Sequence, residues 1–325
     1  MPSLFSNAKR RKLALPGREM EIALIDWGGD GPLALLHHAN GFCAGMWALL
    51  AERLRPHYRV VALDARGHGD STAPSPGPAY DWMNFVEDLI PLAEQLADEQ
   101  GAPIAYGIGN SFGGLVTAYA AGLRPGLFER VAMLDPVVRP GEAQIEEMRE
   151  KMSLPVPRED FDSRGNPMAQ AARSRQPVWP SRDLAVEKWG GKEMFESWDP
   201  RALRLYVDEG MRDREDGQVE LKCDPQIEAC IFDASGILDI FDVTEQIEAP
   251  TLLLRAGRGH FPMVVYQEVV ERIPNAKLLE LDIDHLMPMH NPPELAEILL
   301  EFGGVAGGFY SSTVTASSTR TRTST

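Results

Sequence analysis

The chain contains 325 residues, of which 44% are hydrophobic and 25% are charged, and its formal net charge at pH 7 is -16. This composition is typical of a folded globular protein, and the length allows one large domain with an insertion or two ordinary domains. Nucleic acid and anionic membranes would repel so acidic a protein, so we expect neither as a partner.

The cysteines and the N-terminal residues indicate the compartment. Cys43, Cys223 and Cys230 show no spacing typical of a zinc site, and so sparse a set favours a reducing environment over a disulfide framework. The N-terminal stretch carries charge but lacks the apolar core of a secretory signal. No apolar run reaches the length of about 18 residues that predicts a membrane span. We therefore expect a cytoplasmic protein without a metal site.

Up to residue 134 the sequence alternates between predicted strands and predicted helices, a pattern typical of a mostly parallel, doubly wound sheet. Residues 11–15 and 20–27 are typical of edge strands, whereas 32–37 and 58–64 are continuous apolar runs of the kind that is buried on both faces. The remaining predicted elements are helices at 48–54 and 82–96, a strand that starts at Pro103, an alanine-rich helix after Ser111 and a strand at 128–134.

The alternation stops at residue 139 and resumes near residue 250. The intervening stretch is polar and interrupted by proline and glycine, with helices predicted at 142–151, 182–188, 200–210 and 224–231. Strands at 250–255 and 276–281 and helices at 262–273 and 292–302 then restore the pattern. We predict a sheet domain of residues 1–138 and 246–303, a helical insertion at 139–245, and a Gly- then Ser/Thr-rich tail at 304–325 that we expect to be disordered.

The stretch Gly109-Asn110-Ser111-Phe112-Gly113 lies where a predicted strand passes into a predicted helix. This Gly-x-Ser-x-Gly spacing is typical of a nucleophile elbow, in which the serine needs neighbours without side chains two positions away on both sides. The turn would expose the hydroxyl at the positive end of the helix, beside a backbone N–H that can stabilise an oxyanion. An ordinary Gly-Ser turn has the same five letters, but the flanking strand and helix favour the elbow.

Four motifs follow one another along the chain, each at the end of a predicted strand. They are the loop His38-Ala39-Asn40-Gly41-Phe42 with Trp47, the turn Leu63-Asp64-Ala65-Arg66-Gly67-His68-Gly69-Asp70-Ser71, the Ser111 elbow, and Asp284-His285. Together they resemble the α/β-hydrolase family over residues 18–302. The resemblance implies an eight-stranded, doubly wound sheet with a helical cap inserted after the sixth strand, an activity of the serine esterase or lipase kind, and no cofactor or metal.

By this resemblance Ser111 is the nucleophile and His285 is the base that accepts its proton. His285 follows the last predicted strand, whereas His68 is expected to stabilise its own turn, and His37 and His38 to shape the oxyanion loop. Haloalkane dehalogenases, a branch of the family, use an aspartate nucleophile, so Ser111 excludes their chemistry.

The resemblance places the oxyanion hole at the backbone N–H groups of Asn40 and Phe112. The family usually has His-Gly-x in this loop, whereas this chain has His38-Ala39-Asn40. Gly41 is therefore a second candidate for the donor.

The acid is where this sequence departs from the family pattern. The acid usually follows the seventh strand, where this chain has Gly259-His260. Some branches place it after the sixth strand, and Asp135 lies there, so we predict Asp135 as the acid. A structural role for Asp135, an acid at Asp282 or Asp284, and a dyad without a carboxylate remain alternatives.

The resemblance implies hydrolysis of a carboxylic ester, or of a related acyl bond, in a small and largely apolar substrate. Phe42 and Met46 are the predicted substrate-binding residues. Phe112 and the tryptophans Trp179, Trp189 and Trp198 are further candidates that could equally pack the cap onto the sheet domain. The alternatives are lactone, thioester or carbon–carbon bond hydrolysis, perhydrolysis, or a family member that binds a ligand without catalysis.

Overall fold

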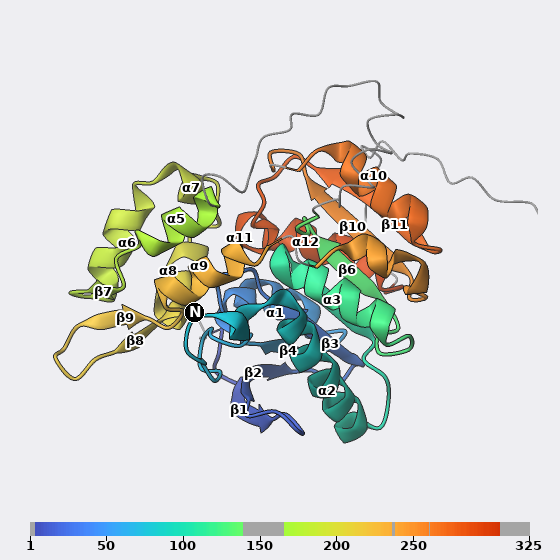
Figure 1. Cartoon of the computed structure of the whole chain (residues 1–325), viewed down its shortest axis with the longest axis horizontal. Helices are drawn as coiled ribbons and strands as arrows, with labels where there is room; N and C mark the ends of the chain where they lie inside the picture. Colours follow the sequence, from blue (N-terminus) through green and yellow to red (C-terminus); the bar gives the residue numbers. More distant parts are fainter. Residues whose placement is uncertain (1–3, 139–165, 236–237, 260, 306–325) are drawn as a thin grey trace, which may run out of the picture.

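The computed structural model describes residues 4–138, 166–235, 238–259 and 261–305, and Figure 1 shows their arrangement. Its centre is an eight-stranded sheet with the strand order β1-β2-β4-β3-β5-β6-β10-β11. β2 pairs antiparallel with β1 and with β4, and the other neighbours are parallel. The strands are β1 (Lys9–Ala14), β2 (Glu21–Gly28), β3 (Leu33–His37), β4 (Arg59–Leu63), β5 (Tyr106–Asn110), β6 (Val131–Leu134), β10 (Thr251–Ala256) and β11 (Ala276–Leu281).

Helices cover both faces of this sheet. Apolar side chains of α1 (Ala48–Leu54) and α12 (Pro292–Phe302) pack on one face, and those of α2 (Trp82–Gln100), α3 (Phe112–Leu123) and α10 (Met263–Arg272) pack on the other. β3, β5 and β6 are buried along their whole length, as continuous apolar runs require. The predicted doubly wound, mostly parallel sheet is therefore confirmed.

Several shorter elements lie between these strands and helices. They are η1 (Ala44–Trp47), η2 (Pro78–Tyr80), η3 (Ile240–Asp242), η4 (Thr244–Gln246) and α11 (Met287–His290).

Among the described helices, none combines the length and the apolar composition that a membrane crossing requires.

The predicted boundaries of two strands were wrong. The strands expected to start at Pro103 and at residue 128 begin instead at Tyr106 and Val131. Only a single bridge, between Ile104 and Phe128, pairs the chain before these points. Ile104 and Ala105 before β5 are apolar and buried, so the sequence pattern does not separate them from the strand. Before β6, the charged residues Glu129 and Arg130 follow Phe128, and the strand begins only after them.

The described part of the insertion, residues 166–235, lies to one side of the sheet in Figure 1. It contains a small antiparallel sheet with the order β7-β9-β8, which the sequence did not predict because its strands are only two or three residues long. The predicted helix at 142–151 and most of the tail lie outside the described residues. The elements are α5 (Pro167–Arg173), β7 (Val178–Trp179), α6 (Arg182–Gly190), α7 (Glu193–Glu196), α8 (Ala202–Gly210), β8 (Met211–Asp213), β9 (Val219–Leu221) and α9 (Pro225–Asp233).

Candidate active site

Ser111, Asp135 and His285 come together at the carboxyl edge of the parallel strands. Ser111 follows β5, Asp135 follows the neighbouring strand β6, and His285 lies in the loop after β11. The carboxyl ends of parallel strands share one edge of a sheet, which is where sites in this class of fold form. The topology therefore brings together residues that are far apart in the sequence.

The backbone of Ser111 has φ 56° and ψ -121°, a conformation that residues other than glycine rarely adopt. The two flanking glycines make this corner sterically accessible. A Cβ on Gly109 would lie 2.2 Å from the carbonyl oxygen of Gly113, and one on Gly113 would lie 2.4 Å from the carbonyl oxygen of His37. The steric argument made from the Gly-x-Ser-x-Gly spacing therefore holds at both positions.

A chain of hydrogen bonds links the three side chains. His285 Nε2 lies 2.7 Å from Ser111 Oγ, and His285 Nδ1 lies 2.5 Å from Asp135 Oδ2. The contact predicted between Asp135 and His285 is present. This geometry can carry a proton from the serine hydroxyl to the imidazole while a carboxylate faces the far side of the ring.

The two alternative acids lie elsewhere. Asp284 accepts a hydrogen bond from Ser197 and pairs with Arg258 at 3.2 Å, while the side chain of Asp282 is exposed. The interpretation that Asp282 or Asp284 orients His285 is therefore wrong. His260 lies outside the described residues.

Asp135 is fully buried and has a φ of 44°, so its surroundings hold it firmly in place. Its Oδ1 accepts hydrogen bonds from the N–H of Ala256 and from the hydroxyl of Tyr266, both at 2.9 Å. The Tyr266 hydroxyl also lies 3.0 Å from the carbonyl oxygen of Pro136. Burial raises the pKa of Tyr266, with the neighbouring Asp135 as a further cause, so this hydroxyl stays protonated and acts as a donor. Sequence reasoning missed Tyr266, because no local motif links it to a residue 131 positions away.

Asn110 is a second residue that sequence reasoning missed. Its side-chain Nδ2 donates to the carbonyl oxygen of Leu134 at 2.8 Å and to that of His285 at 3.1 Å. The residue is fully buried, and it ties the end of β5 to both the end of β6 and the histidine loop. The elbow spacing treats this position as variable, so it carries no signal for such a role.

The predicted oxyanion donors face no hydrogen-bond acceptor among the described residues. No hydrogen bond within that part of the chain uses the N–H of Asn40 or of Phe112. The N–H of Gly41, the alternative donor, is taken by His68 Nε2 at 3.0 Å. The geometry thus favours Asn40 over Gly41. The side chain of Phe112 packs edge-on against Trp82 and Phe85 in the core, so it does not line a substrate pocket.

Two buried histidines tie the oxyanion loop, residues 38–43, to the turn at 64–71. His38 Nε2, in the loop, accepts a hydrogen bond from the N–H of Ala65 in the turn at 2.9 Å. In the opposite direction, His68 Nε2, in the turn, accepts one from the N–H of Gly41 in the loop. The two rings meet edge-on at 4.9 Å. Burial lowers the pKa of His68 to about 4 and that of His38 well below its usual value, so both rings are neutral acceptors at pH 7. The expected structural roles of His38 and His68 match these contacts.

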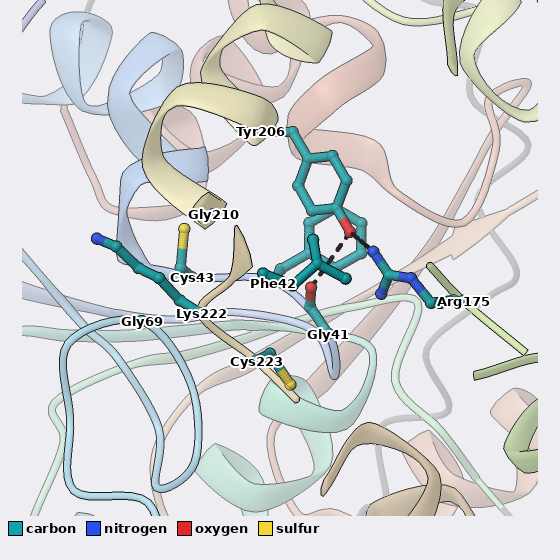
Figure 2. Close-up of a pocket in the computed structure, with 10 residues that line it drawn as sticks. Gly41, Phe42, Cys43, Gly69, Arg175, Tyr206, Gly210, Lys222 and Cys223 are labelled. Atoms are coloured by element: carbon teal, nitrogen blue, oxygen red, sulfur yellow. Dashed lines mark hydrogen bonds between the residues drawn. The ribbon is translucent and has the colours of Figure 1, made fainter. Parts of the chain in front are cut away.

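The predicted substrate-binding residues differ in their placement. Phe42 borders the small cavity of Figure 2, and its ring lies 4.7 Å from that of Tyr206 and 6.1 Å from that of Trp198. Met46 is fully buried in the apolar cluster that includes α1 and does not line this cavity. The tryptophans of the insertion are also buried and contact one another or other aromatic rings, which is a packing role.

Within the described residues no group of histidine, cysteine and carboxylate side chains is arranged to hold a metal ion.

Comparison with known proteins agrees with this fold. A family model described as the alpha/beta hydrolase family matches residues 34–298. Because that span is most of the chain, the protein belongs to the alpha/beta hydrolase family.

Individual relatives are distant. A type I acyl-CoA thioesterase, mpaH', from Penicillium brevicompactum is 28% identical over 132 residues, which are 41% of this chain but only 27% of the thioesterase. A fluoroacetate dehalogenase from Burkholderia sp is 25% identical over 284 residues, or 85% of this chain and 88% of that protein. The solved structure of E-2-(acetamidomethylene)succinate hydrolase is 17% identical with a TM-score of 0.71, covering 91% of this chain and 98% of its own. Such a structural likeness is evidence of the fold alone.

Proposed function

We propose that this protein is a serine hydrolase that cleaves a carboxylic ester, or a related acyl bond, of a small and largely apolar substrate. The observation that carries the proposal is the hydrogen-bonded chain from Asp135 through His285 to Ser111, at 2.5 and 2.7 Å. A hydroxyl becomes an effective nucleophile when an adjacent imidazole accepts its proton and a carboxylate orients that imidazole.

In the first half of the proposed reaction, Ser111 Oγ attacks the acyl carbon while its proton passes to His285 Nε2. The N–H groups of Asn40 and Phe112 hold the negative charge that develops on the acyl oxygen. His285 then returns the proton to the leaving group, and an ester between Ser111 and the acyl group remains. In the second half, water attacks this ester with His285 again as base, which releases the acid and restores the hydroxyl.

The names of the relatives denote different substrates: an acyl-CoA thioester, fluoroacetate and E-2-(acetamidomethylene)succinate. The serine at the elbow supports acyl transfer, because haloalkane dehalogenation proceeds through a carboxylate nucleophile. Thioesters and esters share the same acyl-enzyme route, so we place both within the proposed substrate class.

Covalent labelling with a fluorophosphonate, located by peptide mass spectrometry, tests the proposal. We expect labelling at Ser111 and hydrolysis of p-nitrophenyl esters in a series of rising chain length, with the matching thioesters measured alongside. Ser111→Ala and His285→Ala should each lower turnover by about a million-fold, because nucleophile and base act as a unit. Unchanged circular dichroism spectra would serve as the folding control. Failure to label at excess probe, together with the absence of hydrolysis, would favour a family member that binds a ligand without catalysis.

A further inference from the structure

Three polar side chains of the insertion form a cluster over the oxyanion loop. Arg175 follows α5, Tyr206 lies on α8 and Glu228 lies on α9. The guanidinium of Arg175 joins the other two, since it donates to the Glu228 carboxylate and, at 2.6 Å, to the hydroxyl oxygen of Tyr206. Figure 2 shows Arg175 and Tyr206 converging on Gly41.

This cluster contacts the loop at the two residues that matter for the proposed oxyanion hole. The Tyr206 hydroxyl faces the carbonyl oxygen of Gly41 at 3.4 Å, and the backbone carbonyl oxygen of Glu228 accepts the Asn40 side-chain amide at 3.0 Å. The approach is so close that a Cβ on Gly41, whose φ is 79°, would lie 2.7 Å from Glu228 Oε1. The insertion is therefore packed directly against the loop backbone.

Arg175 decides the direction of the hydrogen bond from Tyr206. A guanidinium has donors and no acceptor, so the Tyr206 oxygen must be the acceptor in their contact. The single proton of Tyr206 is then left for the Gly41 carbonyl. Burial raises the pKa of Tyr206 to about 12, so this proton is retained at working pH. Arg175 therefore occupies the Tyr206 oxygen as an acceptor and leaves its proton available for the loop carbonyl.

The space around the cluster argues against a role in holding substrate. The cavity that Arg175, Tyr206, Gly41 and Phe42 border is about 10 Å³, which is room for one water molecule and not for part of a substrate. Arg175 is also paired with Glu228, so its charge is already neutralised. Its contacts are those of a residue that positions its neighbours.

We propose that Arg175 is a positioning residue through which the insertion sets the backbone of Asn40 and Gly41 for oxyanion binding. His68 holds the same loop from the sheet domain, through the N–H of Gly41. The loop is thus held on both sides at Gly41, the residue directly after the one that presents the Asn40 N–H. This inference rests on the proposed function, because it assigns the oxyanion donor to Asn40.

Replacing Arg175 with Met tests the inference, because the methionine keeps the apolar stem and removes the donors. We expect turnover to fall by about 100-fold, the usual effect of a small displacement of a catalytic group. The KM for p-nitrophenyl esters should stay within about threefold for short and long acyl chains alike, since no substrate contact is lost. The affinity for a boronic acid, which forms a tetrahedral adduct with the serine, should fall in parallel with kcat/KM.

Tyr206→Phe isolates the hydroxyl and keeps the packed ring, so it tests the same step if Arg175→Met folds poorly. We expect a similar fall in turnover, and no further fall in the double variant, because the two side chains act through one hydrogen bond. Arg204→Met is the matched control: like Tyr206, Arg204 lies on α8, but its ion pairs are with Asp183 and Asp208, which are not part of the loop or the cluster. Turnover is counted per active site titrated with the fluorophosphonate, so misfolded molecules do not contribute.

The outcomes separate this inference from the proposed function. If the unmodified enzyme labels at Ser111 and hydrolyses esters while Arg175→Met and Tyr206→Phe keep its turnover and boronate affinity, the inference is wrong and the function stands. A rise in KM that depends on acyl chain length would instead make Arg175 a substrate-binding residue, which also overturns the inference. If the unmodified enzyme neither labels nor hydrolyses esters, the proposed function itself fails.

Discussion

Gly259 and Asp135 share one corner of the site: a Cβ on Gly259 would lie 2.8 Å from Asp135 Oδ2 and 3.0 Å from the carbonyl oxygen of Ala256. Gly259 follows β10, the seventh strand of the large sheet in chain order, which is where the family pattern usually has the acid. Here the carboxylate from β6 uses that space and reaches His285 from the neighbouring strand. The acid at one strand end therefore requires the absence of a side chain at the other.

Gly259→Ala should lower turnover by about 10- to 100-fold, because the added methyl group displaces the carboxylate that faces His285. Overpacking of this kind also costs about 1–3 kcal/mol of the free energy of unfolding. Steady-state kinetics and urea denaturation measure the two effects. Gly191→Ala is the matched control, since a Cβ at that position meets nothing within 4 Å. Equal activity of both variants would show that a methyl group at position 259 does not displace the Asp135 carboxylate.

Asp135→Asn should lower turnover by up to about ten-thousand-fold, because an amide facing the imidazole favours the wrong tautomer of the base. The fold should survive, since the asparagine oxygen can still accept from the N–H of Ala256 and the hydroxyl of Tyr266. The measurement is kcat beside a thermal melt. A variant that loses stability but retains most of its specific activity would assign Asp135 a purely structural role.

Tyr266→Phe should lower turnover by about tenfold and change the pH dependence of kcat/KM, because Asp135 Oδ1 loses one of its two donors. A carboxylate with one donor fewer holds the charged imidazolium more strongly, so we expect activity on the acid side to fall away at a higher pH. The measurement is the profile of kcat/KM from pH 5 to 9.

Tyr106→Phe is the control for that experiment, since it removes a buried hydroxyl that has no hydrogen-bond partner within the described part of the chain. Its pH profile should match that of the unmodified enzyme. If Tyr266→Phe lost stability while its profile kept the same shape and position, Tyr266 would serve packing alone.

His68→Gln should make the stability of the protein less sensitive to acid. The folded-state pKa of His68 is lowered to about 4 by burial, below the ordinary value of 6.5, so the unfolded chain binds the proton first. The stability from this group is complete above pH 6.5 and is lost as the pH falls toward 4. Between pH 7 and 5 the loss is on the order of 2 kcal/mol, which the variant should not show.

Urea denaturation of both proteins at pH 7 and pH 5 gives the two differences in the free energy of unfolding. Asp64, whose pKa burial raises to about 6, acts in the opposite direction but is present in both proteins, so the comparison cancels it. His37 and His38 also remain in both. If the two proteins lose the same free energy between these pH values, His68 does not stay neutral in the folded state.

The sequence by itself determined the parts of the site that depend on neighbouring residues. Ser111 could be recognised because a glycine stands two positions away on each side of it. The structure gives the reason: a Cβ at Gly109 or Gly113 would collide with neighbouring backbone. The order of strands and helices followed in the same way, because the period of apolar residues is a property of each short segment. These features depend on residues that are close together in the sequence, so the sequence alone can reveal them.

Only the tertiary structure decided which distant side chains meet. Asp135 and His285 are 150 positions apart, and the sequence left several carboxylates open as the partner of the base. Tyr266 beneath Asp135 and Arg175 beside Tyr206 gave no local signal, because each contact depends on how separate helices pack and not on the spacing of letters. The short strands of the insertion were missed for a related reason, since two or three residues carry no period and pair only where the surrounding chain places them.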